Sequence, residues 1–537
     1  MEEKLGARPH RPGLWGWLVP LLITVVAGAL RLRGLSNPHL LIFDETYYAK
    51  DAYALLIAGH ELVWPEGADD MWLSGSAAPT DEGSYVVHPP LGKWLIAIGL
   101  HLFGMESGFG WRVSAAVAGT LSVLLITLIT QRMFRSVFLG AVAGVLTAVE
   151  GHHLVMSRVA MLDIFLMLFV LAAFGALLMD RCSTRRRLAA WVETHQTQPA
   201  QPDQPAEPAQ PSHPEQPKGP WLLWRPWLFA AGILLGAATA VKLSALAFVA
   251  AFGIMVVLWD LQARRAAGIR RWAFSGLTRD TPWALITVLP LALFTYVSSW
   301  AGWLLSSSAS HRQWHTQHEA EGLATLVPGP LRSLWAYHRE ATNFHQDLTS
   351  GHDYASSPWT WLFMGRPVSM HYQSYEHGES FPWDEDAVCR AQTCSSAILD
   401  LANPLIWWTA LIGVVVVLLL WLGRRDWRYG AILAGYAGGF AVWLLFPDRT
   451  MFFFYTISFH PFVILTLVVL AALILRAGHR PDQSEERRRE LQRRNTVIVL
   501  CYVLLAVAVS VFFLPLWTGE LIPTDQWRLR MWLENWI

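Results

Sequence analysis

Long blocks of apolar residues recur along the whole chain, and they limit its fold more than any other feature. A helix needs about 20 such residues to cross a hydrocarbon core of roughly 30 Å. These blocks are apolar on all sides, whereas the helices of soluble proteins present one polar face. Composition agrees, because 53% of the 537 residues are hydrophobic and only 15% are charged. The sequence therefore predicts an all-α protein that crosses a membrane many times.

We expect about eleven transmembrane helices, each carried by one block of sufficient length. The blocks cover residues 14–33, 111–131, 137–150, 159–179, 221–239, 243–259, 283–303, 404–422, 430–446, 453–475 and 495–516. A further apolar stretch, Leu91–Phe103, is short, follows two prolines, and carries Lys93 and His101. Its length alone does not decide whether it crosses the membrane.

The distribution of arginine decides the placement of Leu91–Phe103, because cytoplasmic loops carry an excess of basic residues. If this stretch does not cross, five Arg-rich segments fall on the same side as the N-terminus. They contain Arg132 and Arg135, Arg181 and Arg185–Arg187, Arg264–Arg271, Arg424–Arg428, and Arg487–Arg494. If it crosses, the first three of them move to the other side. We therefore predict that Leu91–Phe103 lies along the outer membrane interface and that the N-terminus is cytoplasmic.

This topology divides the chain into five parts and gives it two large extracytoplasmic loops. They are the N-terminal membrane half 1–180 with its external loop 34–110, a cytoplasmic linker 181–220, central membrane helices 221–303, a second external loop 304–403, and C-terminal membrane helices 404–537. Prolines occupy every third position from Pro199 to Pro220. That period is typical of a polyproline II spacer, with an SH3-type ligand as the alternative. Cys389 and Cys394 could pair if their loop is extracytoplasmic.

Two adjacent carboxylates, Asp44 and Glu45, stand out in the first external loop. Such a pair near a membrane surface suits a general base that takes a proton from a hydroxyl, or a metal site. The alternative is a helix N-terminus, where acidic residues are favourable.

Further ionisable residues collect on the same predicted outer face, although sorting across the membrane disfavours basic residues there. They are Arg31, His88, Lys93, Arg158, Asp163, Lys242, Asp448 and Arg449. Taken singly, each basic side chain could reach out to lipid headgroups. Taken together, they indicate an anion site, and a phosphate at the membrane surface is the natural anion.

Several of these residues stand in motifs that are similar to those of a known family. Phe43–Glu45, followed by the His-Pro-Pro-Leu-Gly-Lys string at His88–Lys93 and by Arg158 and Asp163, resembles the protein O-mannosyltransferases. Asn403–Trp408 extends the resemblance into the C-terminal part. The family has the GT-C glycosyltransferase fold. Loop 304–403 is too short for the MIR module of eukaryotic members, so the resemblance is to the bacterial, actinobacterial-type proteins.

The resemblance implies a donor, an acceptor and a set of roles. The donor would be polyprenyl-phosphate mannose held in the membrane lipid, and the acceptor a Ser or Thr of a protein leaving the Sec translocon at the plasma membrane. Asp44 would be the general base, and Glu45 would help to bind or orient the acceptor. Arg158 and Lys242 would hold the donor phosphate, with Arg31 as a further candidate. Transfer would be a single inverting displacement on the outer face.

A metal or nucleic acid is not expected to take part. Asp44, Glu45, Asp163 and several histidines of loop 304–403 could supply ligands to a divalent cation. His311, His315 and His318 have helical spacing, but no HExxH motif accompanies them. We predict that no cofactor is required. The formal net charge is zero, which gives no overall field for nucleic acid.

Two other functions compete with this reading. A GT-C transferase that acts on a glycolipid or a cell-wall glycan would share the fold and the phosphate site, and only the His88–Lys93 string favours a protein acceptor. A multi-pass transporter would place charges within its spans and show repeat symmetry between halves. Here the spans are nearly free of charge and no inverted repeat is evident.

Overall fold

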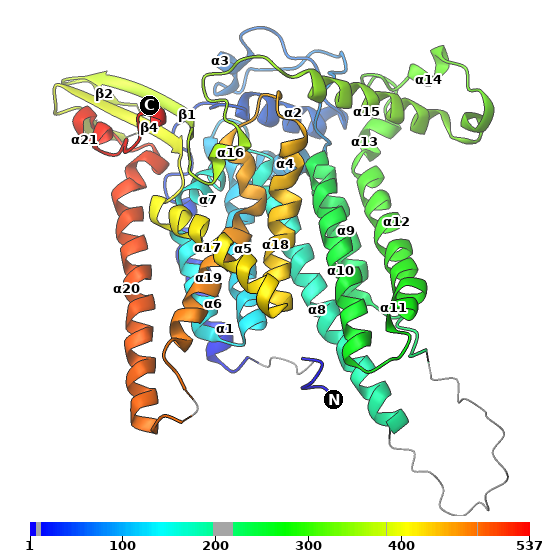
Figure 1. The fold of residues 1–537 in the computed structure, drawn as a ribbon. Coiled ribbons are helices and arrows are strands. Elements are labelled where there is room, and N and C mark those ends of the chain that lie inside the picture. The colour runs from blue at the N-terminus through cyan, green and yellow to red at the C-terminus, as the bar shows by residue number, and fades with distance from the viewer. Residues whose placement is uncertain (7–11, 197–217, 383, 481) are drawn as a thin grey trace, which may run out of the picture.

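The computed structural model describes residues 1–6, 12–196, 218–382, 384–480 and 482–537. The period-three prolines from Pro199 to Pro217 lie outside these residues. Long helices form a bundle, and one end of it is covered by short helices and a small sheet (Figure 1). We call this the α2 end, after the helix α2 (Glu45–Ala58) that lies there.

The long helices coincide with the predicted blocks. They are α1 (Trp15–Leu32), α5 (Gly108–Phe134), α6 (Val137–Val149), α8 (Asp163–Gln196), α9 (Pro226–Val241), α10 (Leu246–Ala266), α12 (Thr281–Ser299), α17 (Pro404–Arg424), α18 (Trp427–Phe440), α19 (His460–Arg476) and α20 (Glu485–Thr518). Within the described residues, eight helical segments are long and apolar enough to cross a membrane. The prediction of a multi-pass helical membrane protein is confirmed. The other three predicted spans, 137–150, 221–239 and 430–446, coincide with the shorter helices α6, α9 and α18.

Side-chain caps mark where several of these helices begin. The hydroxyl of Ser107 accepts a hydrogen bond from the backbone of Phe109 at the start of α5, and Ser136 does the same for α6. The side chain of Asn403 accepts from two backbone N–H groups of α17. These groups would otherwise lack partners at a helix N-terminus.

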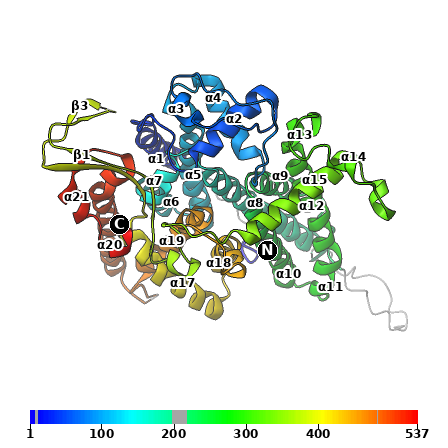
Figure 2. The same cartoon turned by 90° about the horizontal axis from the view of Figure 1, so that it is seen from above.

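Helix α4 (Leu91–Phe103) packs against α2 and α5 at the α2 end, near α3 (Ala68–Trp72) (Figure 2). Its 13 residues span about 20 Å, which is short of a hydrocarbon core of roughly 30 Å. One face is buried and includes Lys93, whereas Leu102 and Phe103 are exposed. An interfacial position for α4 stays a prediction.

The predicted external loop 304–403 folds at the α2 end, with both helical and β structure (Figure 1). The short helices α11 (Trp272–Ser275) and α13 (Ala301–Leu305) come earlier in the chain. The loop itself contains α14 (Trp314–Gln317), α15 (Gly329–Asp347), α16 (Pro358–Trp361), β1 (Val368–Glu376), β2 (Ser380–Phe381), β3 (Asp384–Val388) and β4 (Thr393–Asp400). The sequence did not predict these strands. Antiparallel β1 and β4 pair from Val368–Asp400 to Glu376–Thr393. Strand β5 (Ile522–Pro523), just before α21 (Thr524–Leu529), extends the sheet beside β4.

Cys389 and Cys394 form a disulfide across the β3–β4 connection. The pairing that the sequence left open is therefore present in the structure. It links the two sides of the turn that leads into β4.

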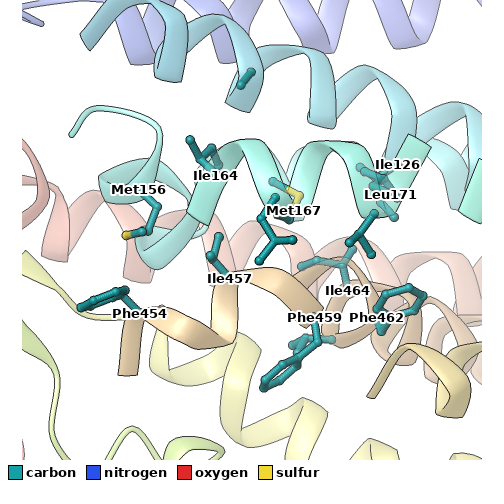
Figure 3. Packing of buried hydrophobic residues seen from close by; sticks show 14 of the residues in the cluster. Ile126, Met156, Ile164, Met167, Leu171, Phe454, Ile457, Phe459, Phe462 and Ile464 are labelled. Carbon is teal, nitrogen blue, oxygen red and sulfur yellow. The ribbon is translucent and has the colours of Figure 1, made fainter. Parts of the chain in front are cut away.

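The core lies between α5, α8 and α19, and it supports a segment that reaches the functional site. Met156 of α7 (Gly151–Met156), Met167 of α8 and Phe462 of α19 pack in one buried cluster (Figure 3). The 3₁₀ segment η5 (Phe453–Phe459) is buried along its whole length in the same cluster. Its position is therefore fixed by packing against the membrane helices.

Candidate active site

Asp44 stands directly before α2, at the covered end of the bundle. The preceding residue, Phe43, has a left-handed φ of 50° and packs edge-on against Phe454 of η5. Burial and, to a smaller extent, the nearby Asp163 carboxylate raise the pKa of Asp44, to about 6. Lys242 and a hydrogen bond with Tyr48 act in the opposite direction. Asp44 is thus a carboxylate whose proton affinity is raised toward neutral pH.

Lys242 and Asp163 form an ion pair close to Asp44. Lys242 follows α9, and its Nζ donates to both carboxylate oxygens of Asp163, at 2.9 and 2.7 Å. The ammonium also lies 4.9 Å from the ring centre of Tyr455. The carboxylate and the aromatic face both attract a cation, so they hold the ammonium in place.

A cavity of about 330 Å³ opens on one side of this ion pair. Its polar lining comes from His88, Lys242, His345, Arg449 and Tyr455, and its apolar lining comes from the start of α10 and the segment after α18. The rings of His88 and His345 stack with centroids 5.4 Å apart. Arg449 places Nη2 3.3 Å from Nδ1 of His345. The cavity therefore combines two cationic groups with two imidazoles beside an apolar wall.

Both histidines of this cavity are neutral at physiological pH. Burial lowers the pKa of His88 well below its usual value, and the charge of Lys242 lowers it further. Burial and the Arg449 guanidinium lower the pKa of His345 to about 4. Each neutral imidazole can donate one hydrogen bond and accept another.

A second cavity, of about 670 Å³, lies on the other side of His88. It is lined by Asp44, Tyr47, Tyr48, Lys50, Asp51, Leu62, Val63, Trp64, Ser84, Tyr85, Val86, Val87, His88, Lys93, Phe344 and Leu348. Lys93 is buried there, ion-paired with Glu61 and 3.6 Å from Asp51. His88 lines both cavities, so the two spaces are neighbours, with Lys242 in the lining of the first and Asp44 in the lining of the second.

Glu45 does not line either cavity, although it is adjacent to Asp44. Its carboxylate is fully buried and accepts from Nε and Nη2 of Arg112, both at 2.7 Å. It also accepts from the backbone N–H groups of Ile42 and Ala160. The structure thus puts Glu45 in a support that joins the first loop to α5 and to the chain before α8.

Two of the predicted phosphate ligands, Arg158 and Arg31, are engaged elsewhere. Arg158 donates to the backbone carbonyls of Leu30, Arg31, Arg33 and Gly34, at the end of α1. Arg31 is buried, and its guanidinium contacts His153 Nδ1 at 2.8 Å and backbone carbonyls of α1 and α6. Neither residue lines the two cavities beside Asp44.

Most of the other predicted site residues lie near Asp44 or in the cavities, and one does not. His88, Asp163 and Lys242 lie close to Asp44, and Arg449 lines the neighbouring cavity, whereas Asp448 is exposed. The sequence reasoning missed Tyr48, Asp51, His345 and Tyr455. His345 was one of eight histidines in its loop, and its stacking on His88 depends on contacts between distant segments.

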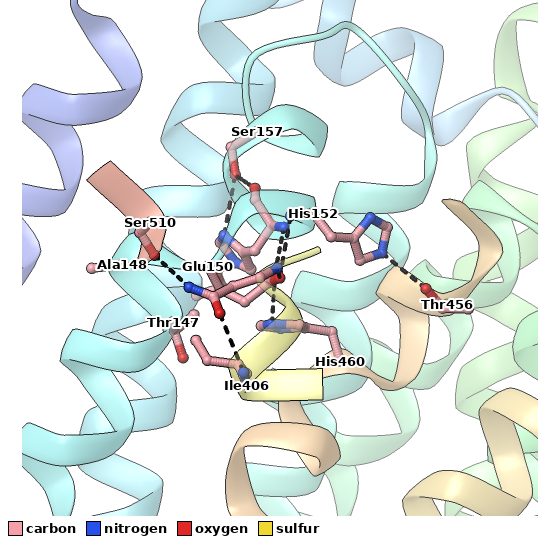
Figure 4. Close-up of polar contacts among 12 residues, drawn as sticks. Thr147, Ala148, Glu150, His152, Ser157, Ile406, Thr456, His460 and Ser510 are labelled. Atoms are coloured by element: carbon pink, nitrogen blue, oxygen red, sulfur yellow. Dashed lines mark hydrogen bonds and ion pairs between the residues drawn. The ribbon is translucent and has the colours of Figure 1, made fainter. Parts of the chain in front are cut away.

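A buried polar network around Glu150 and His152 contacts Thr456 of η5 (Figure 4). His152 has Nδ1 2.7 Å from Asp400 at the end of β4, and Nε2 3.1 Å from the Thr456 hydroxyl of η5. Glu150 accepts from backbone N–H groups at the start of α7 and lies 3.1 Å from His460. Buried groups of this kind are stabilising when their partners are present.

In the parts of the chain that the structure describes, no three His, Cys, Asp or Glu side chains are grouped so as to hold a metal ion. The positive charge in the cavity of about 330 Å³ comes from Lys242 and Arg449.

Comparison with known proteins decides the family. Residues 21–195 match the dolichyl-phosphate-mannose-protein mannosyltransferases, and residues 330–536 match the C-terminal four-helix membrane region of protein O-mannosyltransferases. A polyprenol-phosphate-mannose–protein mannosyltransferase of Mycobacterium tuberculosis is 35% identical over 548 residues, which cover 97% of this chain and 92% of the relative. The chain belongs to the protein O-mannosyltransferase family.

Other protein O-mannosyltransferases agree with this assignment. Proteins with the same description from Mycolicibacterium smegmatis and Corynebacterium glutamicum are 35% and 30% identical, and the matches cover 97% and 96% of this chain and 93% and 92% of the relatives. The structure of the S. cerevisiae protein O-mannosyltransferase Pmt1-Pmt2 complex bound to the sugar donor superposes with a TM-score of 0.69 at 14% identity. That match covers 100% of this chain and 94% of the other. The predicted bacterial family and its GT-C fold are confirmed.

The two matched regions of this protein O-mannosyltransferase meet at the site. The first contains Asp44 and Asp163, and the second contains His345, Arg449 and Tyr455. Lys242 lies in the central part between them and joins the two through its contacts with Asp163 and Tyr455.

Proposed function

We propose that this enzyme transfers a single mannose from polyprenyl-phosphate mannose to Ser or Thr hydroxyls of secreted and membrane proteins. The names of the bacterial relatives support the substrates. The observation that carries the chemistry is the position of Asp44 close to Lys242, with each residue lining one of two neighbouring cavities. A glycosyl transfer needs a base for the acceptor and a cation for the departing phosphate, and this site offers both.

The cavity of about 330 Å³ would receive the donor phosphate. Lys242 and Arg449 supply positive charge to the leaving group, and the neutral imidazoles of His88 and His345 can donate hydrogen bonds to its oxygens. Hydrogen-bond donors that are fixed in a site with little water stabilise the negative charge that develops on the leaving phosphate by roughly 3–4 kcal/mol. The apolar wall formed by Leu246 and Val442 gives the polyprenyl chain a path into the bilayer.

The cavity of about 670 Å³ would receive the acceptor peptide. The hydroxyl oxygen forms a bond to the anomeric carbon as the bond from that carbon to the phosphate oxygen breaks. Asp44 accepts the hydroxyl proton, and polyprenyl phosphate leaves with the bonding electrons. Attack and departure on opposite faces of the sugar invert the anomeric centre.

Glu45, Arg158 and Arg31 act as positioning residues in this proposal. Glu45 and Arg112 fix the loop that carries Asp44, and Arg158 fixes the end of α1 through four backbone carbonyls. This revises the roles that the family resemblance implied, because none of the three lines the cavities. No cofactor is required, since Lys242 and Arg449 provide the charge that a divalent cation would otherwise supply.

The enzyme resides in the plasma membrane in this proposal, with a cytoplasmic N-terminus and with the α2 end outside. Acceptor segments would reach the second cavity as they leave the Sec translocon, before folding hides their hydroxyls. The period-three prolines would then belong to a cytoplasmic linker.

Proteoliposomes loaded with labelled polyprenyl-phosphate mannose and a Ser/Thr-rich peptide test the function. We expect label in the peptide with wild-type enzyme and none with Asp44→Asn. Label that enters glycolipid or glycan but never peptide would establish the alternative GT-C activity. Movement of donor across the bilayer without any transfer would favour transport.

A further inference from the structure

A strongly basic cavity lies among the end of α5, the start of α18 and the end of α19. These helix ends lie at the end of the bundle opposite α2 (Figure 1). The volume of the cavity is about 470 Å³. Five arginines line it: Arg132, Arg135, Arg181, Arg428 and Arg476. Arg132 lies near the end of α5 and Arg135 just after it, Arg181 lies on α8, Arg428 lies at the start of α18, and Arg476 lies at the end of α19. The rest of its lining comes from Gly6 of the N-terminal segment, Met133, Phe134, Leu178, Cys182 and Trp427.

Arginines at helix ends are common at a cytoplasmic surface, where they interact with headgroups or with the helix dipole. Arg181 departs from that pattern. Its side chain is only 7% exposed, and its Nε has no hydrogen-bond partner among the described residues. Its guanidinium lies 3.8 Å from the centre of the Trp427 ring and 5.6 Å from that of Trp259.

Five positive charges lie close together around this cavity. Asp426 pairs with Arg428 at 2.6 Å, and Arg428 also lies over the ring of Phe134. Like charges gathered around one space repel each other, so an anion that enters it is stabilised by all of them. Arginine matches phosphate oxygens in particular, because its planar fork can donate two parallel hydrogen bonds.

An apolar groove of about 700 Å³ adjoins this cavity, and Trp427 lines both. The groove runs between α10 and α18, with Ala251, Ile254 and Leu258 on one side and Leu433 and Ala437 on the other. From Ala251 to Gln262 it follows α10 for about 16 Å. Ile254 and Leu258 are more than half exposed, so the groove faces the surroundings of the bundle.

We propose that this composite site binds an anionic phospholipid. Its phosphate headgroup sits among the five arginines, and an acyl chain lies in the groove between α10 and α18. A free phosphate would contact only the arginines. The cavity and the groove together, which share Trp427, fit a molecule that is anionic at one end and apolar at the other. The site is separate from the donor site, because it lies at the opposite end of the bundle.

Native mass spectrometry and thermal unfolding of the full chain test the proposal. The purified enzyme is mixed with phosphatidylglycerol, phosphatidylcholine of the same acyl chains, or inorganic pyrophosphate. We expect retention of phosphatidylglycerol and a higher unfolding temperature with it, and neither effect with phosphatidylcholine. A shift with pyrophosphate that equals the shift with phosphatidylglycerol would overturn the lipid and leave a soluble anion. Equal retention of both lipids would overturn the headgroup site.

Variants locate the binding. Arg181→Gln removes the buried cation, and the double variant Arg132→Gln, Arg476→Gln removes two less buried ones, so a folding defect in the first does not affect the second. We expect phosphatidylglycerol to bind about fivefold more weakly for each arginine lost. Arg493→Gln, an exposed position on α20, is the matched control and should bind as wild type. Unchanged binding in the folded double variant would contradict the assignment.

Discussion

The ammonium of Lys242 donates to both carboxylate oxygens of Asp163, at 2.9 and 2.7 Å, across 79 residues of sequence. This contact holds the turn after α9 against the first residue of α8. Both charges act on Asp44: Lys242 lowers its pKa, and Asp163 raises it. A phosphate that approaches Lys242 therefore enters a site whose cation is already positioned.

The pH dependence of transfer should reflect Asp44. Its pKa is raised to about 6, and a general base works as the carboxylate, so the rate should rise with pH through about 6 and level off above it. Asp44→Asn should lower kcat by roughly 10²–10⁴-fold while donor binding changes little. Initial rates between pH 4.5 and 8, with donor binding measured in parallel, check this. A variant that turns over like wild type would remove Asp44 from the chemistry.

Lys242→Gln should weaken both donor binding and turnover, because it removes the cation nearest to the base. We expect kcat/KM for the donor to fall by roughly 10²–10³-fold. Asp163→Asn is the informative companion, since it keeps the ammonium and loses only its anchor. Donor titrations should show a smaller loss for Asp163→Asn, and equal losses in both variants would mean that the ion pair is purely structural.

Glu45→Gln should destabilise the fold. The change leaves Arg112 buried without its charged partner, and breaking such a pair costs about 3–5 kcal/mol. The midpoint of thermal unfolding in detergent measures this, with Glu82→Gln at an exposed position of the same loop as control. A normal midpoint with lost transfer would instead place Glu45 in contact with the acceptor.

Arg158→Gln separates a positioning role from phosphate binding. The guanidinium bonds to four backbone carbonyls at the end of α1, so its loss should lower the unfolding midpoint. The fraction that stays folded should bind donor with a KM close to wild type. A large rise in donor KM at an unchanged midpoint would restore the phosphate role that the resemblance implied.

Chelation should leave transfer unchanged. Lys242 and Arg449 carry the positive charge in the proposed mechanism, and no step needs a divalent cation. Transfer assays with excess EDTA, followed by addition of Mg²⁺ or Mn²⁺, measure the effect directly. Activity that disappears with EDTA and returns with one metal would require a metal site in the mechanism.

Sequence patterns predicted the membrane helices well because transmembrane length and hydropathy are local properties. The predicted topology put Asp44, Asp163 and Lys242 on one face of the membrane, whereas their closeness to one another comes from the structure. The roles of Arg158 and Glu45 were harder to predict, because the sequence does not show whether a charged residue in a loop contacts a ligand or another part of the protein. That distinction depends on partners such as Arg112, which lies 67 residues from Glu45. The β1–β4 sheet and the stacking of His345 on His88 depend on similar long-range contacts.

His88 belongs to both cavities, and this has a kinetic consequence. The donor and the spent polyprenyl phosphate travel by two-dimensional diffusion in the bilayer, whereas the peptide arrives and leaves through water. In the proposed mechanism the two cavities share only His88, so the donor and the peptide reach the reaction by different routes. Raising the lipid content of the membrane should dilute the donor without changing the apparent affinity for the peptide.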